Sequence, residues 1–356
     1  MTPRTTTVAM PGRPAQAPDA MALVEQCRAT VEPALRDAVD SLSGLVRHLC
    51  GYHMGWWDSD GRPESGASGK AVRPAMTLLS AVAAGGSRTG AVPAAVAVEL
   101  VHNFSLLHDD VMDRDATRRH RPTVWAEFGT GPAILAGDAM LALALDVLAA
   151  ERVPAPDGGR TPEARLAACV QELVEGQMDD LAFEHRDDVE VAECLRMAER
   201  KTGALLGAAC AVGACCAGAA ERVVRGFDEF GRGVGVAFQL VDDLLGIWGD
   251  PARTGKPVRS DLRSRKKSLP VVAALRSRTP PGDELELLYT REREMTEAEL
   301  ERAATLVERA GARDWAAERI DTLTAAALVR LQAHDPPREP AAALRSVARL
   351  LTRRDH

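Results

Sequence analysis

The chain has 356 residues and a formal net charge of −7, with 44 Lys and Arg against 51 Asp and Glu. Its 46% hydrophobic and 27% charged residues are typical of a globular protein and exclude a disordered chain. The acidic excess argues against a nucleic-acid partner, because affinity for the phosphate backbone depends on clustered Lys and Arg. Only six Phe, five Trp and two Tyr are present. Together with abundant alanine, this favours helices packed through small side chains over a β-sandwich.

The N-terminal segment 1–20 is polar and rich in proline, and it lacks the apolar core of a secretory signal. We interpret this segment as a disordered tail. No apolar run approaches the roughly 20 residues that a membrane span needs, so no span is predicted. The seven cysteines are odd in number and follow no ligand spacing. These features predict a reduced, cytoplasmic protein.

Helical periodicity dominates from residue 21 to the C-terminus, and no convincing period-2 strand is present. No linker divides the chain, so residues 21–356 are predicted to form one large all-α domain. Loop signals occur at 51–69, 84–90, 153–162 and 248–260. The first loop is long and rich in glycine, which is typical of functional loops in compact proteins. The amphipathic helices after residue 276 are expected to be scaffold.

Asp-Asp pairs occur four times, so a pair alone is weak evidence, and its plainest interpretation is a solvated helix face. The pairs are Asp109–Asp110, Asp179–Asp180, Asp187–Asp188 and Asp242–Asp243. The first pair ends an apolar helical segment in which Asp109 and Asp113 are i and i+4. His102 and Ser105 lie on the same stripe. The last pair is placed within a second apolar segment, 236–246.

Acidic side chains buried together need a positive partner, because burying several unpaired anions is prohibitive. A hard divalent cation is the usual solution. Mg²⁺ prefers oxygen ligands and typically binds through one or two carboxylates together with substrate phosphates. Two acidic helix ends that face each other across a cavity would therefore form a clamp for Mg²⁺ and a diphosphate.

Six motifs follow one another in the order and spacing of a known family. They are Gly69-Lys-Ala-Val-Arg-Pro74; Asp109-Asp-Val-Met-Asp113; Arg118-Arg119 with Pro122-Thr123; Lys201-Thr202; Phe238-Gln-Leu-Val-Asp-Asp243; and Gly255-Lys256 with Asp261-Leu262 and Lys266 to Pro270. Over 69–270 the chain resembles the polyprenyl synthetases, the trans-type isoprenyl diphosphate synthases. The resemblance implies a single large helical bundle around a central cavity, usually a homodimer. It also implies a prenyltransferase that uses Mg²⁺, with three ions per active site, to condense isopentenyl diphosphate head-to-tail with dimethylallyl, geranyl or farnesyl diphosphate.

The resemblance also implies roles for individual residues. Metal ligands are expected at Asp109, Asp110, Asp113, Asp242 and Asp243, and an isopentenyl diphosphate site at Lys70, Arg73, His102 and Arg119. An allylic diphosphate site is expected at Arg118, Lys201, Thr202, Gln239, Lys256 and Lys266. The catalytic residues would be Asp109, Asp113, Asp242, Lys201 and Lys256. Gln177 and Asp180 are expected to support the site from behind, Asp187 and Asp188 to be surface acids, and His108 to be structural.

The two diphosphates require different treatment. The one that leaves is best held by metal, which stabilises the charge that develops on it, and the one that stays is best held by protein cations. Lys70 and Arg73 precede a helix whose first residue is expected to be Pro74. A helix N-terminus flanked by cations is an anion site. The alternative is an exposed basic turn.

Three positions depart from the family pattern. Gly246 replaces the third aspartate of the second acidic motif, so weaker metal binding with retained activity is expected. Asp250, one helical turn further on, is expected to compensate in part. His120 stands where a glycine is common after the arginine pair, and Arg265 stands where one is common before Lys266. Both substitutions put loop geometry in question more than chemistry.

Product length is predicted from Phe104, five residues before Asp109, or about 7.5 Å along a helix axis. In the family this position is a floor of the tunnel that receives the growing chain. With the small Ser105 beside it and no insertion in the first acidic motif, the pattern resembles a geranylgeranyl diphosphate synthase, with farnesyl diphosphate as the second choice. Five positions turn a helix by about 140°, so an ordinary core phenylalanine is the alternative.

Two other functions remain open. A class I terpene cyclase also ionises an allylic diphosphate with Mg²⁺ in an all-α cavity, but it has no need of the isopentenyl diphosphate residues. A non-catalytic partner subunit of a prenyl synthase could lose its aspartates freely. The intact first motif argues against that subunit, and Gly246 keeps it open.

Overall fold

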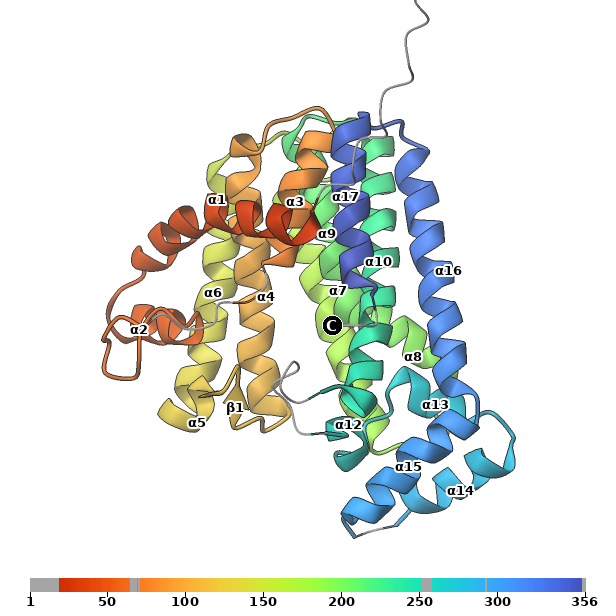
Figure 1. Ribbon diagram of the computed structural model, residues 1–356. Coiled ribbons are helices and arrows are strands. Elements are labelled where there is room, and N and C mark those ends of the chain that lie inside the picture. Colours follow the sequence, from red (N-terminus) through yellow and green to blue (C-terminus); the bar gives the residue numbers. More distant parts are fainter. Residues whose placement is uncertain (1–18, 65–68, 70, 251–257, 292, 354–356) are drawn as a thin grey trace, which may run out of the picture.

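A computed structural model describes residues 19–64, 69, 71–250, 258–291 and 293–353. In this part of the chain the secondary structure is almost entirely helical (Figure 1). The helices are α1 Ala20–Asp40, α2 Gly44–His53, α3 Val72–Ala83, η1 Thr89–Ala91, α4 Val92–Met112, α5 Val124–Phe128, α6 Thr130–Ala150, α7 Pro162–Glu184, α8 Val191–Ala198, η2 Glu199–Gly203, α9 Ala204–Cys216, α10 Glu221–Trp248, α12 Ser260–Arg263, α13 Leu269–Leu275, α14 Pro280–Tyr289, α15 Glu297–Arg309, α16 Ala312–Gln332 and α17 Arg338–Leu351. The predicted all-α class is confirmed.

Two short strands form the one sheet of the described residues. β1 (Thr117–Arg118) and β2 (Arg121–Pro122) pair in an antiparallel hairpin just after α4. A strand of two residues cannot produce a period-2 pattern, which explains why the sequence does not indicate it.

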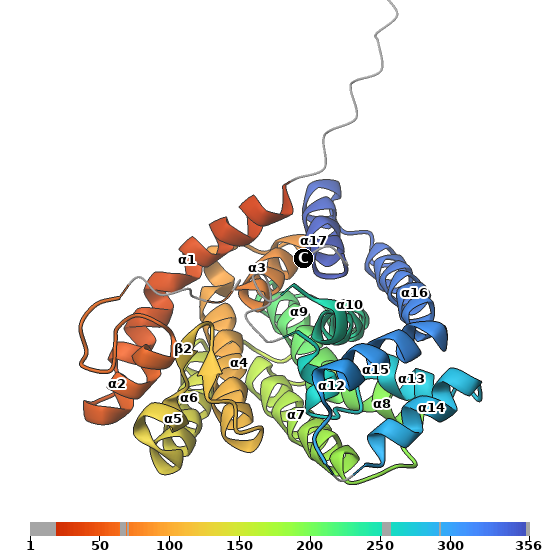
Figure 2. The same ribbon diagram turned by 60° about the horizontal axis from the view of Figure 1, so that its bottom comes forward.

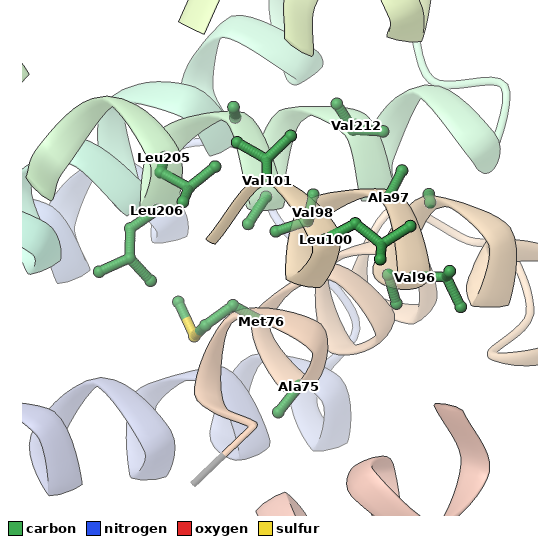
Figure 3. Packing of buried hydrophobic residues seen from close by; sticks show 14 of the residues in the cluster. Ala75, Met76, Val96, Ala97, Val98, Leu100, Val101, Leu205, Leu206 and Val212 are labelled. Atoms are coloured by element: carbon green, nitrogen blue, oxygen red, sulfur yellow. The ribbon is translucent and has the colours of Figure 1, made fainter. Parts of the chain in front are cut away.

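The centre of the bundle is made by α4 and α9. From Ala94 to Val101 every side chain of α4 is buried, and α9 is buried from Ala204 to Cys215. Figure 3 shows residues of both helices packed with Ala75 and Met76 of α3. A helix that is apolar on all sides is stable only when other helices cover it, and α9 contacts α3, α4, α7 and α10.

Glycines allow these helices to approach closely. A Cβ on Gly213 of α9 would lie 2.2 Å from the carbonyl oxygen of Thr77 in α3. One on Gly231 of α10 would lie 2.3 Å from the carbonyl oxygen of Leu206 in α9. The small residues of the sequence therefore account for the tight packing around α9.

Most predicted helix boundaries agree with the structure to within a few residues. The long loop begins after His53 and not at Gly51, because α2 continues further than expected. α3 begins at Val72, two residues before the expected start at Pro74, since Ala71 already adopts a left-handed conformation with φ of 47°. Of the predicted tail, residues 1–18 lie outside the described residues. Asp19 caps α1, accepting from the backbone N–H of Met21.

The sequence has no uninterrupted apolar run of the length of a membrane span, but two helices of the described residues are apolar enough on average, with charged residues within them. The helices Thr89–Met112 and Thr130–Ala150 are long and apolar enough by length and composition. In the first, 67% of the apolar window is buried inside the bundle, as in the core helix of a globular protein, whereas in the second only 39% is buried. The partly uncovered helix, α6, contacts α2, α4, α5 and α7.

The chain brings the ends of two long helices to the same end of the bundle. In Figure 1, α4 runs down to the hairpin at β1, and α10 runs down to α12. Figure 2, turned so that this end comes forward, shows β2, α4, α7, α10 and α12 together. Both predicted acidic motifs therefore lie at this end.

Candidate active site

The first acidic motif lies where α4 ends. Asp113 caps the helix, donating its backbone N–H to the carbonyl oxygen of Asp109 at 2.8 Å. Asp109 is half-buried, and burial raises its pKa to about 6 against the opposing effect of Lys201. Asp113 is the more exposed of the two, and both Lys201 and Lys266 act on its carboxylate. The motif therefore faces lysines that come from other elements.

Asp110 has different surroundings from Asp109. Its side chain is buried, and Oδ1 accepts from Arg118 Nε at 2.8 Å and from Nη2 at 2.6 Å. The other oxygen, Oδ2, is buried without a hydrogen-bond partner among the described residues. Asp110, an expected metal ligand, and Arg118, an expected diphosphate ligand, are thus bound to each other.

The two carboxylates of the second acidic motif differ in their surroundings: Asp243 is hydrogen-bonded within the protein, and Asp242 is exposed. Thr202 donates to Gln239 Oε1 at 2.6 Å, and Gln239 Nε2 donates to Asp243 Oδ1 at 2.8 Å. The backbone N–H of Leu269 donates to the other oxygen of Asp243 at 2.9 Å. Asp243 is 4% exposed, and burial raises its pKa to about 7. Asp242, by contrast, is exposed, so it is the carboxylate of this pair that is open to a metal.

Lys266 lies within electrostatic reach of the acidic ends of both α4 and α10, and Lys201 shares the carboxylate of Asp180 with it. Lys201 Nζ lies 2.6 Å from Asp180 Oδ2, and Lys266 Nζ lies 3.8 Å from the same oxygen. Burial acts to lower the pKa of Lys266, but the surrounding carboxylates, Asp242 among them, hold it above its usual range. Since Lys266 also acts on Asp113, carboxylates of both motifs lie within electrostatic reach of one ammonium group.

A π-helical turn, η2, places Lys201 and Thr202. It is inserted between α8 and α9, and turns of this kind are frequent at functional sites. Gly176 of α7 faces it so closely that a Cβ there would lie 2.5 Å from the backbone nitrogen of Lys201. Close contact with α7 therefore fixes the position from which the Lys201 side chain reaches Asp180.

Buried cations form a second group near the start of α3. Burial lowers the pKa of both Arg73 and Arg119, with Glu99 opposing the change in each case. Burial, with Arg73 and then Arg119 adding to it, lowers the pKa of His102 well below its usual range. The neutral ring accepts from Arg73, whose Nη1 lies 3.2 Å from His102 Nε2. Arg73 Nε is buried with no hydrogen-bond partner in the described structure.

A cavity adjoins these cations. Its lining includes Gly69, Ala71, Glu99, Asn103 and Arg119. A Cβ on Gly69 would lie 2.6 Å from a terminal nitrogen of Arg119, so the absence of a side chain at Gly69 allows the guanidinium to approach the backbone. The buried guanidinium groups and the cavity together suit an anion.

The donor set at the acidic ends fits a hard divalent cation. Asp109, Asp113 and Asp242 offer carboxylate oxygens that are half-buried or exposed, the ligand type that Mg²⁺ prefers. Among the residues that the structure describes, no three Asp, Glu, His or Cys side chains converge on a metal position by themselves. Mg²⁺ typically takes its remaining ligands from substrate phosphates and water.

Phe104 lies on a different side of α4 from the acidic motif. Its ring is buried and packs edge-to-face on His108, with ring centroids 4.8 Å apart. A ring nitrogen of His108 lies 3.0 Å from the carbonyl oxygen of Ile134 in α6. Phe104 therefore shares a face of α4 with His108, whose ring contacts α6, and this position is turned by about 140° from Asp109. His108 has the structural contact expected of it.

The structure shows the surroundings of the three residues that depart from the family pattern, His120, Arg265 and Gly246. His120 and Arg265 have φ of 64° and 53°, so both adopt the left-handed conformation that glycine favours. A Cβ on Gly246 would lie 2.3 Å from Asp261 Oδ2, so the carboxylate of Asp261 fills the space of a side chain at that position. The expectation that Asp250 lies one helical turn further along the same helix is wrong, because α10 ends at Trp248.

The remaining sequence predictions have mixed outcomes. Lys70 and Lys256 lie outside the described residues. Gln177 is buried, and neither polar atom of its amide group has a hydrogen-bond partner among the described residues. Asp187 and Asp188 are exposed, as expected. Asp261 belongs to a motif of the sequence, but its place against Gly246 was not predicted, because only folding brings the two together across fifteen residues.

Comparisons with known proteins identify the family. The family model described as "Polyprenyl synthetase" matches residues 64–307. A Mycobacterium tuberculosis protein named (2E,6E)-farnesyl diphosphate synthase is 46% identical, over 91% of this chain and 90% of that protein. A geranylgeranyl diphosphate synthase of the same organism is also 46% identical, over 86% of this chain and 88% of that protein.

Solved structures agree with these matches. The crystal structure of a polyprenyl synthetase from Streptomyces coelicolor has a TM-score of 0.88 and 44% identity, covering 94% of this chain and 100% of that one. A geranylgeranyl pyrophosphate synthase from Corynebacterium glutamicum, described as complexed with isoprenyl diphosphate and magnesium, has a TM-score of 0.78 and 26% identity, covering 94% and 99%. The chain therefore belongs to the polyprenyl synthetase family and is a prenyltransferase with the all-α isoprenoid synthase fold.

Proposed function

We propose that the chain condenses isopentenyl diphosphate head-to-tail with an allylic diphosphate to give a short-chain all-trans polyprenyl diphosphate. The observation that carries the proposal is the presence of two anion sites of different character. One lies between acidic helix ends that share Lys266, with Lys201 beside the first of them. The other holds the buried pair Arg73 and Arg119 with neutral His102. A reaction with one departing and one retained diphosphate needs both.

The acidic site would hold Mg²⁺ through Asp109, Asp113 and Asp242, with Asp110 and Asp243 behind them and three ions as the expected number. Bound Mg²⁺ would stabilise the negative charge that develops on the departing pyrophosphate. The solved relative described with magnesium supports this assignment. Asp243 and Asp110 already bind protein groups through Leu269 and Arg118, which supports a role for both in holding the site together.

The cations around the acidic site would bind the allylic diphosphate. Lys201 and Lys266 share Asp180 as a partner, so Asp180 positions both ammonium groups for the substrate. Thr202 and Gln239 are hydrogen-bonded to each other and would orient the same group. Arg118 and Lys256 complete the expected set, the first on the hairpin and the second outside the described residues.

The second site would bind isopentenyl diphosphate through Arg73, His102 and Arg119, with Lys70 expected beside them. Protein cations alone suit a diphosphate that stays attached to its carbon chain. The double bond of isopentenyl diphosphate attacks the allylic cation, and the proton lost afterwards is expected to go to the departing pyrophosphate. Positioning and preorganised charge would therefore supply the catalysis, and no protein nucleophile is required.

We propose geranylgeranyl diphosphate as the product, with farnesyl diphosphate as the alternative. The comparison with relatives does not distinguish the two products, because a farnesyl and a geranylgeranyl diphosphate synthase have the same sequence identity to the chain, 46%. The argument depends on the buried Phe104 beside the small, buried Ser105. The proposal requires that the tunnel for the growing chain pass the face of α4 that Phe104 shares with His108, where the ring would limit product length.

We also propose that the enzyme is a homodimer of the cytoplasm. Leu135 of α6 is 63% exposed and Met178 of α7 is 66% exposed, and Ile134 and Val174 on the same two helices are also exposed. Adjacent exposed apolar side chains are typical of a surface that another chain covers. All seven cysteines are free thiols, which agrees with a reducing compartment.

The test is turnover of purified protein with Mg²⁺, isopentenyl diphosphate and each allylic primer in turn, with product length read by mass spectrometry. We expect consumption of isopentenyl diphosphate and a twenty-carbon diphosphate. A hydrocarbon formed without isopentenyl diphosphate would instead identify a class I terpene cyclase. Pyrophosphate release only after addition of a second, related synthase would identify a non-catalytic partner subunit.

A further inference from the structure

The loop that follows α2 is a compact element, which we name the tryptophan loop (residues 54–64). Glu64 donates its backbone N–H to the carbonyl oxygen of Trp56 at 3.0 Å, and Trp57 pairs with Pro63 in a short bridge. The indole N–H of Trp57 donates to the carbonyl oxygen of His48 in α2 at 2.8 Å. The indole also covers Gly51, where a Cβ would lie 1.9 Å from the ring. The loop is therefore closed on itself and seated on α2.

The hairpin that carries Arg118 and Arg119 has an unfavourable turn. Arg119 and His120 are its two central residues, with φ of 51° and 64°. Two left-handed central residues define a type I′ turn, which favours asparagine and glycine. Because neither residue is a glycine, contacts outside the turn must stabilise this conformation.

Arg121 supplies those contacts by joining the hairpin to the tryptophan loop. Its Nη1 donates to the carbonyl oxygen of Tyr52 at 3.1 Å, and its Nη2 donates to the carbonyl oxygen of Trp57 at 2.9 Å. Nη2 also lies 3.0 Å from a carboxylate oxygen of Glu64. The guanidinium lies over the ring of Tyr52, 4.5 Å from its centroid, and the hydroxyl of Tyr52 donates to the carbonyl oxygen of Pro122 at 2.9 Å. Only the planar fork of an arginine can make all these contacts at once.

Arg119 depends on this arrangement more than Arg118 does. Arg118 has its own anchor, the paired hydrogen bonds to Asp110. Arg119 makes no side-chain hydrogen bond or ion pair with the residues that the structure describes, although its guanidinium lies close to Gly69. Its direction is therefore set by the backbone of the turn, which Arg121 holds from the opposite strand.

We infer that Arg121 and the tryptophan loop are a brace that positions Arg119 for isopentenyl diphosphate. This inference rests on the proposed function, since it concerns the substrate assigned to Arg119. Arg121 is a positioning residue, because its own guanidinium is occupied by Tyr52, Trp57 and Glu64. The brace also gives the long glycine-rich loop of the sequence a specific function, which is to hold the turn of a hairpin with no glycine in it.

The experiment compares Arg121→Met, Arg121→Lys and Tyr52→Phe with a control, Arg62→Met, in the same loop. Arg62 pairs with Asp58 and Asp60, and among the described residues it has no hydrogen bond or ion pair with the hairpin. Steady-state rates are measured with each substrate varied in turn, and folding is checked by circular dichroism and thermal melting. The wild type is measured first, because its failure to consume isopentenyl diphosphate would refute the proposed function and not the brace.

For Arg121→Met we expect the KM for isopentenyl diphosphate to rise about tenfold, the scale of one lost charged hydrogen bond. The KM for the allylic substrate and kcat should change less than twofold, and Arg62→Met should behave as wild type. Adding His120→Gly to Arg121→Met should lower the KM for isopentenyl diphosphate most of the way back to the wild-type value, because glycine stabilises the same turn without a brace. Arg121→Lys should recover little, since an ammonium cannot bridge both carbonyl groups.

Two results would overturn the inference. One is a folded Arg121→Met enzyme with unchanged KM for isopentenyl diphosphate. The other is an equal loss in kcat and in both KM values that His120→Gly does not relieve, which would show a general structural role. If Arg121→Met does not fold, Tyr52→Phe decides, because it removes only the bond to Pro122. A rise of about threefold in the same KM supports the brace, and no rise contradicts it.

Discussion

Asp109 and Asp110 are neighbours in the chain, yet Lys201 of η2 acts on the first and Arg118 binds the second. The same division occurs between Asp242, which is exposed, and Asp243, whose two oxygens accept from Gln239 and Leu269. In each motif one acid is open to a ligand and its neighbour is fixed by the protein. This division depends on contacts between distant segments, so the Asp-Asp pattern alone could not predict it.

The raised pKa of Asp109 predicts a pH dependence of metal binding. Burial favours the neutral acid, so below about pH 6 the side chain takes up a proton and loses the charge that binds a cation. We expect the affinity for Mg²⁺ in the presence of inorganic pyrophosphate, measured by titration calorimetry, to fall more steeply below pH 6 in wild type than in Asp109→Asn. The variant accounts for the titration of pyrophosphate itself. Equal slopes for both proteins would contradict the prediction.

Restoring the family's aspartate at position 246 is predicted to destabilise the protein without strengthening Mg²⁺ binding. In Gly246→Asp the new side chain meets the carboxylate of Asp261. We expect a loss of about 1–3 kcal/mol of unfolding free energy and no gain in Mg²⁺ affinity. Gly131→Asp, at a position with open space around it, is the control in thermal melting. The pair Gly246→Asp with Asp261→Gly should recover stability. Tighter Mg²⁺ binding with an unchanged melting temperature would refute this account.

Helices were predicted better than the turns between them. The apolar face of α4 and the small residues of α9 have a strong helical signal, and both helices form as expected. The hairpin at β1 and the π-helical turn η2 were not predicted, because each depends on contacts with other segments: Arg121 with the tryptophan loop, and Gly176 with Lys201. These two elements carry four of the expected diphosphate ligands, Arg118, Arg119, Lys201 and Thr202, so the fold was easier to predict than the site.

Phe104 gives a prediction at the level of α4. Removing its ring in Phe104→Ala would open space beside His108, and we expect products at least one five-carbon unit longer by mass spectrometry. The substitution also deletes a buried ring, with an expected loss of about 3–5 kcal/mol, so melting is measured as well. Phe104→Leu, which keeps most of the volume, is the control. Unchanged product length in a folded Phe104→Ala enzyme would remove Phe104 from this role.

The bundle as a whole brings together segments far apart in the sequence at one end, where α4, α7, α10 and α12 meet (Figure 2). The motifs of the sequence predicted the family and the all-α class correctly, because their order and spacing are specific. They could not predict which lysine lies between the acidic motifs, or that Asp261 fills the space above Gly246. Both facts follow from the packing of α12 and the segment after it against α10.

The exposed apolar side chains of α6 and α7 predict the assembly of the whole molecule. We expect the double variant Leu135→Glu and Met178→Glu to shift the protein from dimer to monomer in sedimentation analysis, because charges in an apolar interface are costly. Leu287→Glu, at a side chain of α14 that is also 66% exposed, should leave the dimer intact. A wild-type monomer, or a double variant that is still dimeric, would contradict the prediction.

The most direct measurement of the central claim is the initial rate of pyrophosphate release by the purified protein with Mg²⁺, isopentenyl diphosphate and an allylic primer. We predict release that requires both substrates, stops on chelation of the metal, and falls at least about a hundredfold in Asp242→Asn, the order of loss seen when a group that stabilises transition-state charge is removed. The matched variant Asp188→Asn, at an exposed acid away from the site, should retain the wild-type rate. Undiminished release after complete chelation, or a fully active Asp242→Asn enzyme, would contradict the account.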